Sequence, residues 1–429
     1  MEPSLKSLPK LKGITRIVFT GDVFRIVGDE REPHQLPNVF WLHNLLSYQL
    51  TQITGLIPEI CFGTRDDKSG RALITEAHKI LGLRPVKAWQ NSFWHKEVPS
   101  DLIDLFRPDY DQALVLGFEL SPIIESILNR MGCPWIDVAV SPIRFLDDLL
   151  LSVRLSDHFK SEPLLPFTVS QEDIACAADY VRRWFKAKNS ETILKHDDVV
   201  FFGQTEGDRT LITCDGSFFS AEDTVAALAD LAAKRRLWIK PHPCAPQNPV
   251  VQLAIERLGG QLIKENAYWI LSADADIEVA TVSSSIGHEA PWFGKRTKMF
   301  CDSLLHRMEA GLAIRDSYCF SDFWRVLLEQ IMPISFFHRT QRLDIRHPAL
   351  RETRLKPNVL REQLGFWGMP PDVWAENAST CVRSEIEYAR ELQHARAEIA
   401  ALRASNCWRV TAPLRWLSSH LRSKSPFSP

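Results

Sequence analysis

A lysine and a histidine stand two positions apart in the segment KPHP, residues 240–243, directly after a short apolar run. The prolines at 241 and 243 restrict the backbone, which reduces the entropy lost when the neighbouring side chains are fixed. A cation and an imidazole held together suit an anionic phosphate oxygen. Lys240 and His242 are therefore candidate phosphate-binding residues; the alternative is an ordinary strand-ending turn with a solvated lysine.

Three consecutive serines and a glutamate occur in TVSSSIGHEAPWFGK, residues 281–295. Hydroxyls and free N–H groups at the start of a helix form an anion site, which makes Ser283, Ser284 and Ser285 candidates for it. Glu289 falls in the first turns of that predicted helix, where it would face a sugar hydroxyl of a nucleotide. The alternative is a plain helix cap with a spare hydroxyl.

Carboxylates gather in VVFFGQTEGDRTLITCDG, residues 199–216, where Gln204, Glu206 and Asp208 follow a predicted strand. Glycines at 203 and 207 allow close approach of a ligand, as at an active site. A surface hairpin is the alternative, because Glu-Gly-Asp is good turn chemistry.

Two weaker signals lie nearer the N-terminus, where Asp22 and Glu119 each close a predicted strand. Glu119 stands just before a capped helix and either favours its dipole or acts as a proton donor facing Asp208. A third polar group consists of Arg144, Asp147 and Asp148. These residues either form a network on the surface of a helix or bind an acidic sugar.

Buried strands and amphipathic helices alternate around these candidates. The first half of the chain predicts strands over 14–20, 111–118 and 135–140, with helices over 38–54 and after Ser121. The second half predicts strands over 199–203, 237–239, 261–263, 276–282 and 297–300, and helices over 221–234 and 250–258. This alternation predicts α/β structure, with parallel sheets covered by helices on both faces.

Two such halves joined by a linker predict a GT-B-like fold, in which two Rossmann-like domains face a cleft at the carboxyl ends of their strands. The predicted parts are an N-terminal, acceptor-side domain (1–165), a linker helix (166–198), a nucleotide-sugar-binding domain (199–345), a helical segment returning to the N-terminal domain (346–383) and a helical tail (384–429).

The tail combines two patterns. Apolar residues spaced 4, 3, 4 and 3 form about two heptads of a coiled coil at Tyr388, Leu392, Ala395, Ile399 and Leu402. The segment NCWRVTAPLRWLSSHLR (406–422) then places aromatics, leucines and arginines on a short helix, and no acidic residue follows Glu398. This pattern favours an anchor at the headgroups of anionic lipid over a helix that packs on the protein or on a partner.

Composition limits the classes of protein. The 429 residues are 45% hydrophobic and 24% charged with a net charge of −2, so nucleic acid is not an expected partner. The nine cysteines show no metal-binding spacing, which indicates reduced thiols. The first residues lack the apolar core of a signal peptide, and no stretch approaches the roughly 18 apolar residues of a spanning helix. We therefore expect a cytoplasmic protein that contacts the inner membrane peripherally.

In order, GQTEGD, KPHP and SSSIGHEAPWFGK resemble motifs of bacterial β-Kdo glycosyltransferases of capsule and O-antigen assembly, over roughly residues 14–340. The resemblance implies a GT-B-like enzyme that uses CMP-Kdo and retains anomeric configuration. KPHP and the serine pair are more distantly similar to those of bacterial sialyltransferases. The end of the chain resembles the SWRLTAPLR tails of polysaccharide glycosyltransferases, with Cys407 in place of the usual serine.

The resemblance also implies roles for single residues. Gln204 and Asp208 match the family's glutamine-to-aspartate motif, with Asp208 as the catalytic carboxylate. Glu119 matches the acid/base position. The CMP phosphate would be bound by Lys240, His242, Ser283, Ser284 and Ser285, and its departure would be assisted by His242. Glu289 would contact the ribose, although His288 and Pro291 depart from the family pattern there.

No cofactor is expected, and no metal, because no Asp-x-Asp stands where a nucleotide-bound metal would lie. The expected partners are the nucleotide-sugar donor, a lipid-linked glycan acceptor, the membrane surface and a second copy of the coiled coil. Two alternatives remain open. One is a transferase that uses a sialic-type CMP sugar, or one that inverts the anomeric configuration with Asp22 or Glu119 as base. The other is an inactive GT-B scaffold of a polysaccharide assembly complex.

Overall fold

The computed structural model describes residues 13–25, 35–61, 71–83, 89–95, 97–188, 193–243, 245–302, 304–332 and 360–361. All of them belong to the first of two compact units, Met1–Pro371. The second unit, Asp372–Pro429, lies outside the described residues, so the coiled coil and the amphipathic tail stay predictions. None of the helices in the described part of the chain is long and apolar enough to cross a membrane.

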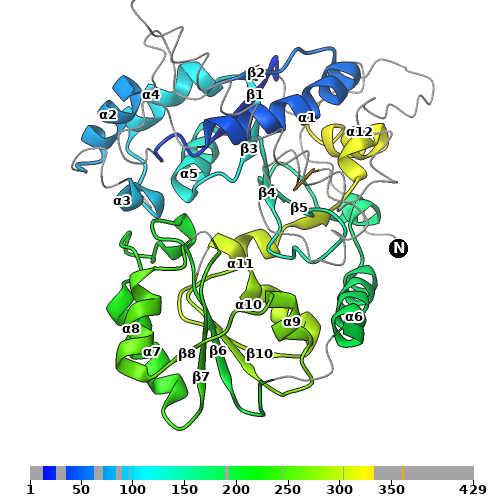
Figure 1. Cartoon of the computed structure of the whole chain (residues 1–429). Coiled ribbons are helices and arrows are strands. Elements are labelled where there is room, and N and C mark those ends of the chain that lie inside the picture. The colour runs from blue at the N-terminus through cyan, green and yellow to red at the C-terminus, as the bar shows by residue number, and fades with distance from the viewer. Residues whose placement is uncertain are drawn as a thin grey trace, which may run out of the picture. The chain divides into compact units, whose positions relative to one another are not determined.

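Among the described residues, six strands form a first sheet (Figure 1). Their order is β11 (Leu312–Ile314), β5 (Leu151–Leu155), β4 (Trp135–Val140), β3 (Ala113–Phe118), β1 (Arg16–Gly21) and β2 (Glu59–Ile60). Strands β1 to β4 run parallel, as predicted. Strands β3 and β4 are buried along their whole length, which explains their near-continuous apolar sequences.

Beyond β4 the first sheet departs from the prediction of a purely parallel sheet, because β5 is antiparallel to β4 and β11 is antiparallel to β5. Through the pairing of β11, the chain has returned to the first sheet by Leu312, and helix α12 (Ser321–Leu328) buries Phe323 and Trp324 in the core of that sheet. The predicted domain boundaries stay predictions.

A second sheet of five described strands is parallel throughout, as predicted. Its order is β10 (Arg296–Met299), β9 (Glu278–Thr281), β6 (Val199–Phe202), β7 (Leu237–Lys240) and β8 (Gln261–Leu262). Strand β6, which is fully buried, lies at the centre and ends immediately before Gly203.

Helices connect the strands of both sheets. Around the first sheet lie α1 (Leu36–Thr54), α2 (Arg71–Ile80), α3 (Gln90–Phe93), α4 (Ser100–Tyr110), α5 (Pro122–Met131) and the 3₁₀ helices η2 (Glu162–Phe167) and η5 (Ser317–Cys319). The second half of the chain contributes α6 (Gln171–Lys188), η3 (Arg209–Leu211), α7 (Ala221–Ala232), α8 (Pro249–Leu258), α9 (Ala267–Ser272), α10 (Ile286–Glu289), η4 (Ala290–Phe293) and α11 (Leu304–Glu309).

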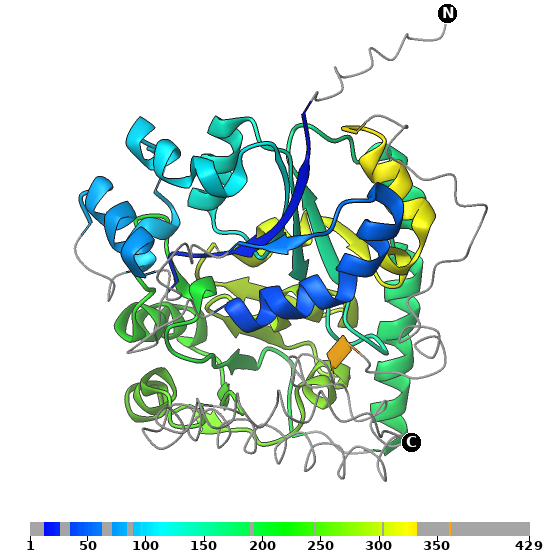
Figure 2. The same ribbon diagram turned by 90° about the horizontal axis from the view of Figure 1, so that it is seen from above.

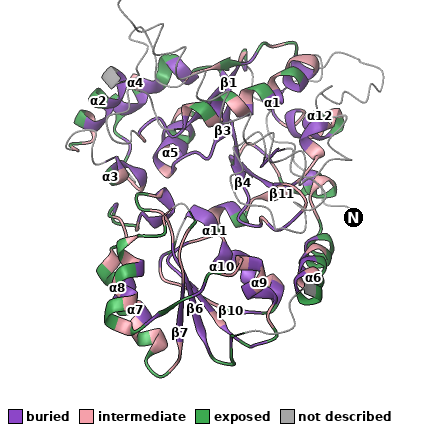
Figure 3. Ribbon diagram, in the orientation of Figure 1, coloured by how far each residue is buried: buried purple, intermediate pink, exposed green. Residues whose placement is uncertain are grey.

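The helices cover both faces of each sheet. Helices α1 and α12 lie side by side on one face of the first sheet, while α4 and α5 lie on the other (Figures 1 and 2). In the second sheet, α7 and α8 share one face and α9 and α10 the other, as right-handed crossovers require (Figure 1). The central strands are buried, and α6, α7 and α8 expose their outer faces (Figure 3). Each sheet therefore presents the carboxyl ends of its parallel strands for a site.

Candidate active site

Each sheet has a point at which the connections leave its centre in opposite directions. In the first sheet this point lies between β1 and β3, and in the second it lies between β6 and β9. Open α/β sheets bind ligands outside the carboxyl ends of the strands at such points. Asp22 and Glu119 follow β1 and β3, and Gln204 and Ser283 lie in the loops after β6 and β9. The topology thus brings candidate residues from distant segments to the two expected positions.

Gln204 joins two of the predicted motifs at the edge of the second sheet. Its Oε1 accepts a hydrogen bond from the Ser283 N–H (2.7 Å), and its Nε2 donates to the Ser283 hydroxyl (3.1 Å). Nε2 also lies 3.4 Å from Oγ1 of Thr210, which in turn accepts from the Ser283 hydroxyl (3.2 Å). Since Ser283 is fully buried, these two candidate residues hold the loops together.

Asp208 is half-buried and begins the one-turn helix η3. Its Oδ1 accepts a hydrogen bond from the Thr210 N–H (3.0 Å), which fixes the carboxylate relative to the turn. Burial lowers the pKa of His242, and the negative charge of Asp208 opposes this change. The GQTEGD and KPHP segments therefore meet at the same edge of the sheet, where the predicted catalytic carboxylate lies near enough to the imidazole to influence its pKa.

Lys240 and His242 are both half-buried at the end of β7. The Lys240 ammonium donates to the carbonyl oxygen of Lys264 (3.0 Å), and burial lowers its pKa while Glu265 opposes this change. Burial is also the main cause of the lowered pKa of His242, and the nearby charge of Arg144 lowers it further. Lys240 thus faces a carbonyl oxygen, whereas His242 lies near residues from both sheets.

The serine turn differs from the predicted helix N-terminus. Helix α10 has four residues and continues as the 3₁₀ helix η4. The N-terminus of a helix attracts anions partly through the helix dipole, which grows with the number of aligned peptide units. The single turn of α10 therefore provides little of it. The Ser285 side chain does not cap the helix, and the half-buried hydroxyls of Ser284 and Ser285 make no hydrogen bond to the described residues. The predicted anion contacts of Ser284 and Ser285 stay a prediction.

Glu289 is buried, with 2% of its surface exposed, and its carboxylate is held by protein groups. Its Oε1 accepts from the Arg144 N–H (2.7 Å) and from the Tyr268 hydroxyl (3.0 Å). Burial raises the pKa of Glu289 to about 7, against the opposing effect of these donors and of nearby Arg361. The predicted ribose contact stays a prediction, and the observed contacts tie α10 to the loop after β4.

That loop, residues 141–150, forms no helix, so the acidic and basic residues within it do not form a helix-surface network. Asp147 pairs with Arg315 (2.9 Å), and Asp148 accepts the N–H of Leu360 (3.0 Å). Arg144 is half-buried and carries its charge toward His242 and Glu289. The loop thus connects the first sheet to the candidate site of the second.

Glu119 lies in the left-handed region of the backbone (φ 52°), which is uncommon for a residue other than glycine. It is 3% exposed, and its carboxylate forms an ion pair with the Arg209 guanidinium, which is 4% exposed. The same guanidinium donates to the Glu119 carbonyl oxygen (2.8 Å). Glu119 therefore contacts the residue that follows Asp208 rather than Asp208 itself.

Asp22 is buried beside this pair. Its Oδ1 accepts from the Ser121 hydroxyl (3.0 Å), so Ser121 stands at the predicted cap position of α5 but gives its side chain to Asp22. Its Oδ2 has no hydrogen-bond partner among the described residues. Burial raises the pKa of Asp22, and the charges of Arg209 and Arg25 oppose this rise.

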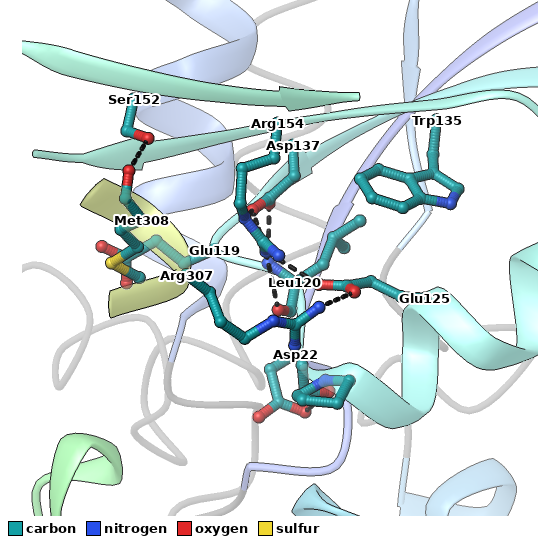
Figure 4. A network of polar contacts seen from close by, with 12 residues as sticks. Asp22, Glu119, Leu120, Glu125, Trp135, Asp137, Ser152, Arg154, Arg307 and Met308 are labelled. Atoms are coloured by element: carbon teal, nitrogen blue, oxygen red, sulfur yellow. Dashed lines mark hydrogen bonds and ion pairs between the residues drawn. The ribbon is translucent and has the colours of Figure 1, made fainter. Parts of the chain in front are cut away.

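A second layer of buried charges supports Glu119 (Figure 4). The Arg154 guanidinium lies 2.5 Å from Asp137 and 2.8 Å from Glu125, and Arg307 of α11 pairs with the other oxygen of Glu125. Asp137 in turn accepts the N–H of Leu120 (2.7 Å), directly after Glu119. The buried ion-pair network thus holds the unusual backbone conformation of Glu119, because Asp137 belongs to that network and binds the next N–H of the chain.

A shallow hollow of about 380 Å³ lies beside the GQTEGD segment, lined by Glu206, Ala245, Pro246, Gln247 and Asn248. Asn248 also donates to the Gln204 carbonyl oxygen (2.8 Å), which connects the loop after KPHP to the hydrogen-bonded side chains of Gln204 and Ser283. Within the described ranges, no group of three or more His, Cys, Asp and Glu side chains is arranged to hold a metal ion.

Neither a protein-family model nor a curated protein matches this sequence. Among solved structures, it is similar to two from Thermosulfurimonas dismutans: KpsC, β-Kdo 2,7 transferase (16% identity, TM-score 0.31, 48% of this chain and 71% of that one) and KpsC, β-Kdo 2,4 transferase (14%, 0.29, 46% and 78%). It is also similar to UDP-GlcNAc 2-epimerase of Neisseria meningitidis bound to UDP-GlcNAc (9%, 0.26, 73% and 98%).

Proposed function

We propose that this chain is a retaining glycosyltransferase that moves Kdo from CMP-Kdo to a lipid-linked polysaccharide acceptor of O-antigen or capsule. One observation carries the proposal. Three segments that resemble β-Kdo transferase motifs lie together at the carboxyl edge of the second sheet, where Gln204 binds Ser283 and Asp208 lies near His242. A catalytic carboxylate beside cationic and hydroxyl groups suits a sugar whose leaving group is a phosphate.

In the first step, an oxygen of Asp208 attacks the anomeric carbon of Kdo while the bond from that carbon to the CMP phosphate breaks. The electron pair of the broken bond goes to the phosphate oxygen. Lys240, His242 and the hydroxyls of Ser284 and Ser285 are proposed to stabilise that charge. Gln204 and Ser283, which bind each other, are proposed to shape this phosphate site, and Glu289 is proposed to border the ribose.

In the second step, the acceptor hydroxyl attacks the same carbon and the bond to Asp208 breaks, so two inversions give net retention. The proton of the acceptor goes to a carboxylate at the edge of the first sheet. Glu119 is the proposed proton acceptor, and Asp22 is its neighbour.

The proposal is tested by incubating the purified full chain with CMP-Kdo and measuring CMP release and the mass of the Asp208 peptide. We expect the wild type to release CMP and to carry one Kdo on Asp208, and Asp208→Asn to do neither. Normal turnover by that variant would remove Asp208 as nucleophile. No turnover of any CMP sugar by the wild type would favour an inactive scaffold, and a preference for CMP-sialic acid would change the donor.

We further propose that the C-terminal tail places the enzyme on the inner membrane, where its acceptor would lie. Residues 406–422 carry Trp408 and Trp416 among arginines, and each basic residue near an anionic surface contributes about 1 kcal/mol. We expect the full chain to float with vesicles that contain phosphatidylglycerol, and to float less after Arg409→Ala and Arg415→Ala together. Equal flotation with neutral vesicles would contradict the electrostatic part.

A further inference from the structure

The turn that begins at Asp208 is held from two sides. On one side, the hydroxyl of Thr210 is bound by Gln204 and Ser283 at the edge of the second sheet. On the other side, the guanidinium of Arg209 reaches Glu119 at the edge of the first sheet. The backbone of Asp208 is therefore fixed between the two sheets by its two following residues.

The anchor of Arg209 in the first sheet is rigid. Glu119 offers its carboxylate and its carbonyl oxygen to the same guanidinium, and its own N–H donates to Val138 (3.0 Å). A left-handed residue other than glycine persists only where its surroundings determine its conformation. Here the next N–H is bound by Asp137, and a methyl group on Gly117 would lie 2.2 Å from the Leu120 side chain.

Both charges of the anchor are buried, so neither is stable without the other. Burial and the nearby charge of Arg25 lower the pKa of Arg209 to about 9, against the opposing charge of Asp22, which leaves the guanidinium protonated at neutral pH. The cation of the anchor is therefore present under the conditions in which a CMP sugar would be used.

We propose that Arg209 is a positioning residue that, held by Glu119, fixes Asp208 for attack on the sugar. The inference rests on the proposed function of Asp208. It assigns Glu119 an effect on the first chemical step, which an acid/base acting on the acceptor would not have. Misplacing a reacting group by about 1 Å costs on the order of 10²-fold in rate, so a loosened anchor affects the rate of attack and not the binding of CMP.

The test compares Arg209→Met, Arg209→Lys, Glu119→Gln and the double variant R209M/E119Q with the wild type in the full chain. The maximal rate of Kdo attachment to Asp208 is measured in a single turnover over a series of CMP-Kdo concentrations. CMP affinity is measured by calorimetry and folding by thermal melting. The control is Arg257→Met, because Arg257 forms an exposed pair with Glu222 on the second sheet's helices.

We expect R209M and E119Q each to lower the maximal rate about 10²-fold with CMP affinity unchanged. R209K keeps the positive charge but not the planar set of N–H donors of a guanidinium, so its maximal rate should lie between those of R209M and the wild type. The double variant should be no slower than the slower single variant, since both changes release the same anchor. R257M should match the wild type. If R209M does not fold, R209K and E119Q provide the comparison.

Three results would overturn the inference. E119Q could attach Kdo at the wild-type rate and slow only its transfer to an acceptor or to water, which would make Glu119 an independent acid/base. The two single effects could multiply in the double variant. CMP affinity could fall as far as the rate. If instead the wild type itself forms no adduct, the proposed function fails first, and the inference fails with it.

Discussion

At the edge of the second sheet, a cluster of neutral side chains joins the loops: Gln204, Thr210 and Ser283 exchange hydrogen bonds. At the edge of the first sheet, the corresponding positions hold buried charges, with Glu119 against Arg209 and Asp22 beside them. The residues occupy equivalent places in two similar sheets. The difference therefore lies in chemistry and not in topology.

The two kinds of edge respond differently to damage. A neutral hydrogen bond contributes about 1 kcal/mol, and its loss is modest when the remaining groups find partners. A buried charge that loses its partner costs about 3–5 kcal/mol, because it cannot regain its hydration. The edge of the first sheet is thus expected to be the more sensitive of the two, and the following changes test this expectation.

The largest loss of stability is expected from Arg154→Met, which leaves Asp137 and Glu125 without their shared cation. All three side chains are less than a tenth exposed, so the free energy of unfolding should fall by about 3–5 kcal/mol. Urea denaturation measures it. Removing all three charges, in E125Q/D137N/R154M, should recover part of the loss.

The matched control for that change is Arg107→Met. Arg107 lies in α4, pairs with Asp104 at 3.4 Å and is half exposed, so its loss should cost less than about 1 kcal/mol. Equal losses from the buried and the exposed arginine would contradict the distinction between the two environments.

A different response is expected from Glu289, a buried carboxylate whose hydrogen-bond donors are neutral groups, a backbone N–H and a phenol. Its pKa is raised to about 7 from an ordinary 4.5. Between these values the folded state keeps a proton that the unfolded state has lost, so stability falls as pH rises from about 4.5 to 7. Because one pH unit corresponds to about 1.4 kcal/mol, the fall approaches 3 kcal/mol.

The variant Glu289→Gln keeps an acceptor and removes the titration. Its stability relative to the wild type should therefore rise between pH 5 and pH 7.5, as measured by urea denaturation at each pH. The exposed variant Glu222→Gln serves as the control and should show the same small difference at both values. A constant difference for E289Q would mean that Glu289 is ionised in the folded state throughout.

Much of the fold could be predicted because local sequence patterns determine many of its strands and helices. The apolar runs of β3, β4 and β6 and the helix α7 lie where the sequence predicts them. The prediction failed at β5 and β11, whose pairing joins Leu151 to Ile314. The edge strand β11 has three residues and is defined by a partner far away in the chain, which no local period identifies.

The candidate site divides in the same way. Polar residues after buried strands located Gln204, Asp208 and His242, since the carboxyl ends of parallel strands share an edge. Arg209 stood in the quoted GQTEGDRT segment but was missed, because its partner Glu119 is 90 residues away. The one signal was a cation directly beside a proposed nucleophile. Tyr268, which binds Glu289, carried no signal in the sequence.

Gly117→Ala tests how tightly the backbone before Glu119 is packed. The added methyl would lie 2.2 Å from Cγ of Leu120, a fully buried side chain. Overpacking of this kind costs about 2 kcal/mol, measured as a lower midpoint in urea. G117A/L120A should lose less than the sum of its single changes. As a control, Gly259→Ala meets no atom within 4 Å but has a left-handed backbone (φ 67°), so it should cost about 1 kcal/mol.

The smallest effect is expected at the neutral edge, from Thr210→Val. Valine keeps the shape of threonine and removes the hydroxyl that accepts from Gln204 and Ser283, while those two residues still bind each other. The free energy of unfolding should fall by about 1 kcal/mol, and Kdo attachment to Asp208 should slow less than in R209M. Thr205→Val, in the same loop, removes a hydroxyl without a hydrogen bond to the described residues and should stay within about 0.5 kcal/mol of the wild type. If T210V instead slows attachment as much as R209M, Asp208 is held equally from both sheets, and the charged edge has no special part in its placement.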